Sequence, residues 1–210
     1  KKAREALEKF GDDLKNEYRT PDPDVTLCVE SAAPTVLPMT NADSEKVVTL
    51  LTCMPNGLIE LSMDVAGLPQ TSLNLGILTT SENEVSASFC VRSSVSSQKE
   101  MLKKRLTRMT ALLGGTVSYF GEYPAWEFKS DSPILKLCAD VYEKKFGKKP
   151  VITAIHGGLE CGLFSEKMPG LDCVSFGPDI FDIHTPREKL SVSSLNRTWE
   201  FLLEVLKEMK

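Results

Sequence analysis

The chain has 210 residues, a length that fits one large domain or two small ones and allows a buried hydrophobic core. Its formal net charge of -4 at pH 7 argues against a nucleic-acid-binding surface, which would need a basic stripe. We find no apolar run of membrane-spanning length and no secretory signal. These bounds favour a globular protein whose partner is neither nucleic acid nor membrane.

The six cysteines form no Cys-x-x-Cys pair, and most of them lie in apolar runs. They are Cys28, Cys53, Cys90, Cys138, Cys161 and Cys173. This usage favours buried, reduced thiols in a cytoplasmic protein over a disulfide framework.

The N-terminal quarter of the chain predicts two helices and a strand. Residues 1–18 carry apolar side chains at spacings of three and four, which is typical of one helix face. Residues 25–30 alternate as a strand does, and Thr40 or Asn41 can cap a second helix. Lys1 lies inside the helical pattern with neither a cap nor an initiator methionine, so we expect a longer parent chain.

The middle of the chain predicts an antiparallel sheet. Residues 58–66, 71–80 and 84–92 read as strands joined by turns short enough for hairpins. A helix capped by Ser97 then runs from Lys99 to Leu113, and residues 116–123 supply a further strand. The expected architecture up to this point is an α+β module with helices on one face of the sheet.

From Ser132 onward, helices alternate with short apolar segments, which predicts an α/β arrangement with a parallel or mixed sheet. The predicted elements are a helix to Phe146, a strand at 151–155, a helix at 159–167, a strand at 171–176 and a helix at 193–210. For the last helix we expect an inward apolar face made of Leu195, Trp199, Leu202, Leu203 and Leu206. Two strands are few for such a sheet, so we expect the missing strands to lie outside this chain.

Candidate ligating residues follow the two predicted strands of this region. His184 comes after the second strand and a turn, where a neutral imidazole can reach a metal ion, although a lone histidine can equally be structural. His156 comes after the first strand and precedes Gly157 and Gly158, whose bare backbone can approach an anionic ligand or simply make a turn.

Three other side chains have both a functional and a structural interpretation. Arg92 ends an apolar strand, and its planar guanidinium suits either a substrate carboxylate or a carboxylate of its own domain. Glu160 can contribute to a site or merely begin a helix. Cys161 near His156 raises a Cys–His nucleophile, which the lack of an orienting third group disfavours.

Several motifs together resemble the aminoacyl-histidine dipeptidases, the Xaa-His or carnosine-hydrolysing type of zinc-dependent exopeptidase. The most specific is HGGLECGLF at residues 156–164. The others, in the order of that family, are Pro55-Asn-Gly, residues 71–80, 91–94, 123–126 and 174–178, and Pro186 after His184.

The resemblance implies a catalytic domain with two zinc ions, or other divalent metals such as manganese or cobalt, interrupted by a lid domain that can form a homodimer. Residues 1–121 resemble most of the lid, and residues 122–210 resemble the end of the catalytic domain. His184 takes the place of a zinc ligand, and Arg92 that of the residue holding the dipeptide carboxylate. Gly157, Gly158, Glu160 and His156 fall in the segment that lines the substrate site.

The same resemblance places the other metal ligands and the catalytic glutamate in a first half that is absent here, so no catalytic residue is expected in this chain. We therefore expect a parent enzyme that hydrolyses dipeptides, preferentially Xaa-His, and an isolated chain that is inactive. Two alternatives stay open: a non-catalytic dimerisation or binding module, and an acylase or carboxypeptidase of the same clan.

Overall fold

The computed structural model describes residues 2–31, 33, 37–154 and 159–209. The chain divides into two compact units, residues 1–44 and 45–210, which are described separately. Within the described ranges, none of the helices has the length and apolar character needed to cross a membrane.

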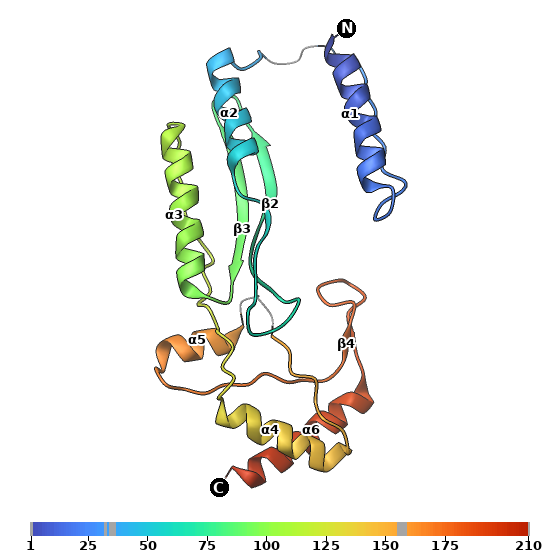
Figure 1. The fold of residues 1–210 in the computed structure, drawn as a ribbon, viewed down its shortest axis with the longest axis vertical. Coiled ribbons are helices and arrows are strands. Elements are labelled where there is room, and N and C mark those ends of the chain that lie inside the picture. Colours follow the sequence, from blue (N-terminus) through green and yellow to red (C-terminus); the bar gives the residue numbers. More distant parts are fainter. Residues whose placement is uncertain (1, 32, 34–36, 155–158, 210) are drawn as a thin grey trace. The chain divides into compact units, whose positions relative to one another are not determined.

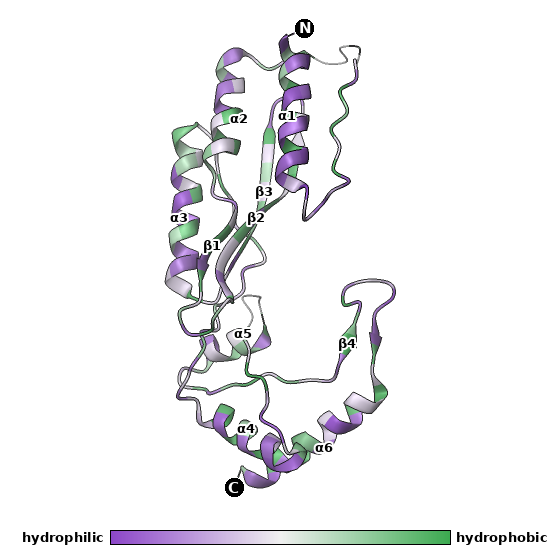
Figure 2. Cartoon of the chain, turned by 45° about the vertical axis from the view of Figure 1, so that its right-hand side comes forward, coloured by the Kyte–Doolittle hydropathy of each residue, from purple (hydrophilic) through white to green (hydrophobic). Residues whose placement is uncertain are grey.

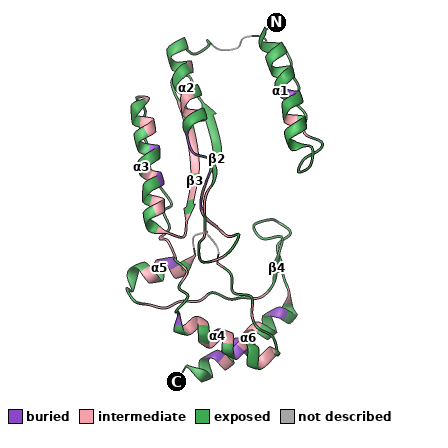
Figure 3. Ribbon diagram, in the orientation of Figure 1, coloured by how far each residue is buried: buried purple, intermediate pink, exposed green. Residues whose placement is uncertain are grey.

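The first unit is dominated by helix α1 (Lys2–Tyr18), as the apolar spacing predicts. Gly11 is its only buried described residue, and a side chain there would come within 3.3 Å of Cβ of Leu27. The predicted strand at residues 25–30 is wrong, since this segment has no regular secondary structure. Most of α1 is exposed, Leu7 and Phe10 included (Figure 3).

The antiparallel sheet is confirmed, with strand order β1-β2-β3. Its strands are β1 (Gly57–Leu61), β2 (Pro69–Thr80) and β3 (Val85–Ser93). The first strand is shorter than predicted because its pairing with β2 ends, after register shifts, at Leu61 and Pro69. Two helices accompany the sheet in Figure 1, α2 (Asn41–Cys53) and α3 (Ser96–Leu112).

One face of the sheet carries the hydrophobic core of this module. Leu73 of β2 packs with Met54, which follows α2, and with Leu102 and Leu106 of α3. Leu102 is fully buried at 0 % exposure. Because successive side chains of a strand alternate between faces, Phe89 and Val91 of β3 join this core while Arg92 lies on the other face. Helices on one face are thus confirmed.

Residues 116–123 do not form the predicted strand. They make no backbone–backbone hydrogen bond with any described residue, and a strand requires a neighbouring strand to pair its N–H and C=O groups. This segment instead connects α3 to the C-terminal part of the chain.

The C-terminal part contains three helices and a small hairpin. They are α4 (Pro133–Phe146), α5 (Glu160–Lys167), β4 (Ile180–Phe181), β5 (Lys189–Leu190) and α6 (Val192–Glu208). The start of α4 is fixed by two caps. Ser132 Oγ accepts a hydrogen bond from the N–H of Leu135, and Asp172 Oδ2 accepts bonds from Ser132 Oγ at 2.8 Å and from the N–H of Ile134 at 3.0 Å.

A second core joins α4 and α6, and it corrects the predicted inward face of α6. Cys138 and Val141 of α4 pack with Phe201 and Val205 of α6. Of the five predicted inward residues, only Leu202 is half-buried, and Trp199 is 59 % exposed. Helix α6 carries apolar residues on more than one face, as the mixed colours in Figure 2 show, and only one face meets α4.

The two predicted buried strands of this region are absent from the described residues. Residues 151–154 and 171–176 have no regular structure, and Val151 is 92 % exposed. Neither segment has a described strand beside it, so no neighbouring strand pairs with its backbone N–H and C=O groups. All six cysteines are free, but the prediction that they are buried is wrong for most: Cys138 is buried, whereas Cys28, Cys53 and Cys90 are exposed.

Candidate active site

His184 lies at the tip of the β4–β5 hairpin. Ile180 pairs with Leu190 and Phe181 with Lys189, so the chain reverses between them and carries an exposed His184 on the connecting loop. The backbone there is strained, because His184 has φ = 65° and Asp182 has φ = 53°. Left-handed backbone costs an L-residue roughly 1–2 kcal/mol. Such conformations concentrate at functional sites, where surrounding contacts impose them.

Local hydrogen bonds impose this loop conformation. The N–H of His184 donates to Oε2 of Glu188 at 2.8 Å. Both the hydroxyl and the N–H of Thr185 donate to the carbonyl of Asp182, at 2.7 and 3.2 Å. The loop therefore holds the backbone of His184, whose side chain is exposed.

These surroundings fit a metal ligand contributed by this chain, but not a complete metal site. Among the described residues, no three His, Cys, Asp or Glu side chains converge as a metal-binding group. A catalytic zinc ion generally takes three protein ligands and keeps one position open. His184 can supply one of these, and the remaining ligands would have to come from elsewhere.

The glycine-rich part of the predicted substrate site cannot be placed. His156, Gly157 and Gly158 lie outside the described residues. Glu160 is exposed in the first turn of α5. Its contribution to a substrate site stays a prediction.

The described surroundings of the Cys161 thiol disfavour a nucleophile. Burial raises its pKa, and Cys173 and Glu160 raise it further. A cysteine nucleophile needs a lowered pKa, because the thiolate is the reactive form. The raised pKa disfavours the Cys–His alternative, whose histidine, His156, lies outside the described residues.

Arg92 lies near the end of β3, as predicted, opposite Ser72 of β2. It is exposed and has no ion-pair partner among the described residues. A guanidinium without a carboxylate of its own remains available to a ligand carboxylate. Among the described residues, no hydrogen bond or ion pair joins Arg92 to His184, so their shared role stays a hypothesis.

Sequence analysis did not identify Glu188 or the α3 side chains that bind the connecting segment at residues 116–123. The signal for Glu188 was its position four residues after His184, shortly after Thr185-Pro186. The α3 contacts had a weaker signal, since Lys99, Lys103 and Thr107 recur every four residues along a helix.

A hollow of about 520 Å³ lies between α4, α6 and the extended segments at 150–153 and 174–177. Its lining includes Tyr142, Phe146, Phe176 and Phe201. Neither His184 nor Arg92 lines it, so we interpret it as an unfilled packing groove and not as the substrate pocket.

Comparison with known proteins identifies a peptidase family to which the chain belongs. The model of peptidase family M20/M25/M40 matches residues 8–208. The cytosol non-specific dipeptidase of Escherichia coli (strain K12) is 35 % identical over 196 residues, which cover 93 % of this chain and 40 % of that protein.

Two solved structures are also similar. The aminoacylhistidine dipeptidase of Vibrio alginolyticus has a TM-score of 0.87 and 35 % identity, over 100 % of this chain and 43 % of that one. The aminopeptidase PepT of Bacillus cereus ATCC 10987 has a TM-score of 0.58 and 20 % identity, over 79 % and 44 %, and supports the fold alone. The chain thus spans about two fifths of the relatives it matches.

Proposed function

We propose that this chain, which belongs to peptidase family M20/M25/M40, is the C-terminal part of a zinc-dependent dipeptidase. The observation that carries the proposal is His184, an exposed imidazole on a strained hairpin loop. The similarity to two dipeptidases over nearly the whole chain supports it. Zinc, when bound, would supply an activated water for peptide hydrolysis.

In this proposal the residues of this chain bind and orient the metal ion and the substrate. His184 holds a metal ion, and Glu188 fixes the loop through the N–H of His184. Arg92 binds the substrate's C-terminal carboxylate through bidentate hydrogen bonds from its guanidinium. Gly157 and Gly158, with His156 and Glu160, line the same end of the substrate. The general base and the other ligands would belong to the part of the protein outside this chain.

The domain division follows the same logic. We propose that residues 1–121 act as a lid-type domain that can form a homodimer, and that residues 122–210 complete the catalytic domain in the cytoplasm. The exposed apolar residues of α6 and the groove beside it support a further part that packs here.

For the substrate we propose dipeptides, with Xaa-His dipeptides such as carnosine preferred. One similar protein is named for aminoacylhistidine substrates, whereas the other is named non-specific, which favours a broad dipeptidase as the second candidate.

The test is a substrate panel on the full-length protein with added zinc: carnosine, other dipeptides and N-acyl amino acids. We expect turnover of dipeptides, fastest with C-terminal histidine. Equal rates on all dipeptides would favour the broad enzyme, and turnover of N-acyl amino acids alone would favour an acylase. Full-length protein that binds zinc yet hydrolyses none of them would leave a non-catalytic module. The 210-residue chain alone should show no metal-dependent turnover of carnosine.

A further inference from the structure

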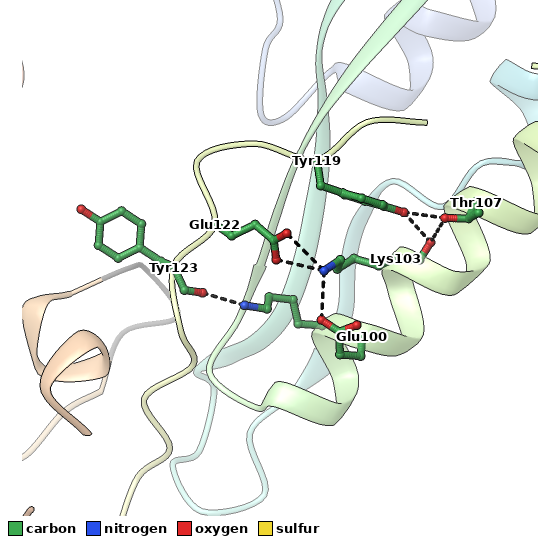
Figure 4. A network of polar contacts seen from close by, with 7 residues as sticks. Glu100, Lys103, Thr107, Tyr119, Glu122 and Tyr123 are labelled. Atoms are coloured by element: carbon green, nitrogen blue, oxygen red, sulfur yellow. Dashed lines mark hydrogen bonds and ion pairs between the residues drawn. The ribbon is translucent and has the colours of Figure 1, made fainter. Parts of the chain in front are cut away.

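Three residues of α3 hold the connecting segment that leads to the C-terminal part of the chain (Figure 4). Lys99, Lys103 and Thr107, hereafter the α3 clamp, recur every four residues and so lie along one side of the helix over about 12 Å. Residues 116–128 of the segment make no backbone–backbone hydrogen bond with any described residue. Its placement therefore depends on side chains.

The contacts run antiparallel to the helix. The hydroxyl of Tyr119 donates to the carbonyl of Lys103 at 2.7 Å and lies 2.7 Å from Oγ1 of Thr107. Nζ of Lys103 lies 2.9 Å from Oε2 of Glu122 and 4.9 Å from the centre of the Tyr119 ring. Nζ of Lys99 donates to the carbonyl of Tyr123 at 2.7 Å.

Lys103 is the centre of this network. It also pairs with Glu100 at 3.1 Å, so one ammonium bridges two carboxylates. The hydrogen bond to Glu122, followed by that to Glu100, raises the pKa of Lys103, and the hydrogen bond to Lys103 lowers the pKa of Glu122. Both partners therefore remain charged at neutral pH.

The next residues of the segment pack directly on α5. A Cβ on Gly162 would lie 2.8 Å from the carbonyl oxygen of Pro124 and 3.6 Å from that of Ala125. Only glycine permits this close approach of a helix to backbone. Within seven residues, the chain thus passes from the α3 clamp to helix α5, which follows the predicted substrate-binding glycines.

We propose that residues 119–125 form a positioning element that fixes the sheet bearing Arg92 relative to helix α5. Lys103 is the positioning residue, since it acts on the substrate site only through this segment. The inference rests on the proposed function, in which Arg92 and the segment before α5 bind the same substrate. A small displacement between two such groups weakens substrate binding without removing either one.

The test uses the full-length protein with Lys103→Met, and Lys104→Met as the matched control, a neighbouring lysine without an ion pair among the described residues. The first readout is the rate of chymotryptic cleavage after Tyr119 or Phe120, since Pro124 blocks cleavage after Tyr123. We expect faster cleavage in Lys103→Met, and in the wild type at high salt, because exposed ion pairs are screened.

The second readout is dipeptide hydrolysis. An exposed ion pair contributes about 0.2–1 kcal/mol, so we expect KM to rise by up to about fivefold in Lys103→Met with a smaller change in kcat. The charge-swapped pair Lys103→Glu with Glu122→Lys should restore both cleavage resistance and KM. A general loss of folding would not be rescued in this way.

Cleavage rates equal to those of Lys104→Met would show that the clamp does not hold the segment. Faster cleavage with unchanged KM would show that the segment is held but does not position the site. Either result overturns the proposal while leaving the dipeptidase intact. A wild-type protein without dipeptidase activity would instead overturn the proposed function, and the cleavage assay would still report on the clamp.

Discussion

Replacing His184 by glycine and by alanine separates its role as a ligand from the strain of its backbone. His184 has φ = 65°, a region in which a Cβ costs roughly 1–2 kcal/mol. Alanine keeps that cost, whereas glycine removes it but loses about 0.5–1 kcal/mol through its greater unfolded-state entropy. His184→Gly should therefore be more stable than His184→Ala by up to about 1.5 kcal/mol.

Activity should not follow this order. Both variants lack the imidazole, so both should lose metal affinity by at least about a hundredfold, since loss of an outer-shell partner alone costs 10–100-fold. The full-length Gly variant would then be more stable than the Ala variant and equally inactive.

Urea unfolding with a chelator present measures the stability difference without a contribution from bound metal. Zinc content by mass spectrometry and carnosine hydrolysis measure the second effect. Equal stability of the two variants would show that the loop does not hold His184 in the left-handed region. A variant that keeps two zinc ions and near-normal rates would show that His184 is not a ligand.

Three further predictions concern single side chains. Glu188→Ala should lower metal affinity by about fivefold in a zinc titration, because the backbone N–H of His184 loses its acceptor and a hydrogen bond contributes about 1 kcal/mol; Glu188→Gln, which keeps an acceptor, should not. Asp172→Ala should lower the free energy of unfolding by about 1–3 kcal/mol in urea, because it removes a charged acceptor from the start of α4, and an unchanged midpoint would contradict that. Arg92→Ala should raise KM for dipeptides by about tenfold or more with a smaller effect on kcat, and unchanged kinetics would make Arg92 structural.

The sequence predicted the elements whose stability is local or formed with near neighbours. Hairpins between β1, β2 and β3 follow from alternation and short turns, and α4 from Ser132 followed by Pro133. Helix periodicity located α5 and α6 for the same reason, since each helix satisfies its own hydrogen bonds.

The sequence failed where a segment depends on a partner that is not close in the chain. Residues 151–154 and 171–176 have the composition of buried strands, yet a strand forms only where a neighbouring strand pairs with its backbone groups. The site shows the same limit. His184 was predicted from its place after an apolar segment, but the Glu188 carboxylate that accepts a hydrogen bond from its backbone N–H was identified only in three dimensions.

Helix α6 shows why the failures share one cause. Its periodicity marks Leu195, Trp199 and Leu206 as clearly as Phe201 and Val205, and spacing alone cannot assign which set meets α4. The structure assigns Phe201 and Val205, which leaves the other set exposed.

Single exposed apolar residues are common, but a helix with a second apolar face beside an unfilled groove is typical of a surface that another part of the protein covers. In the proposed function, a further part of the protein would supply neighbours for the two unpaired segments and the other metal ligands. The two unpaired segments and the absence of a metal-binding group among the described residues would then share one explanation.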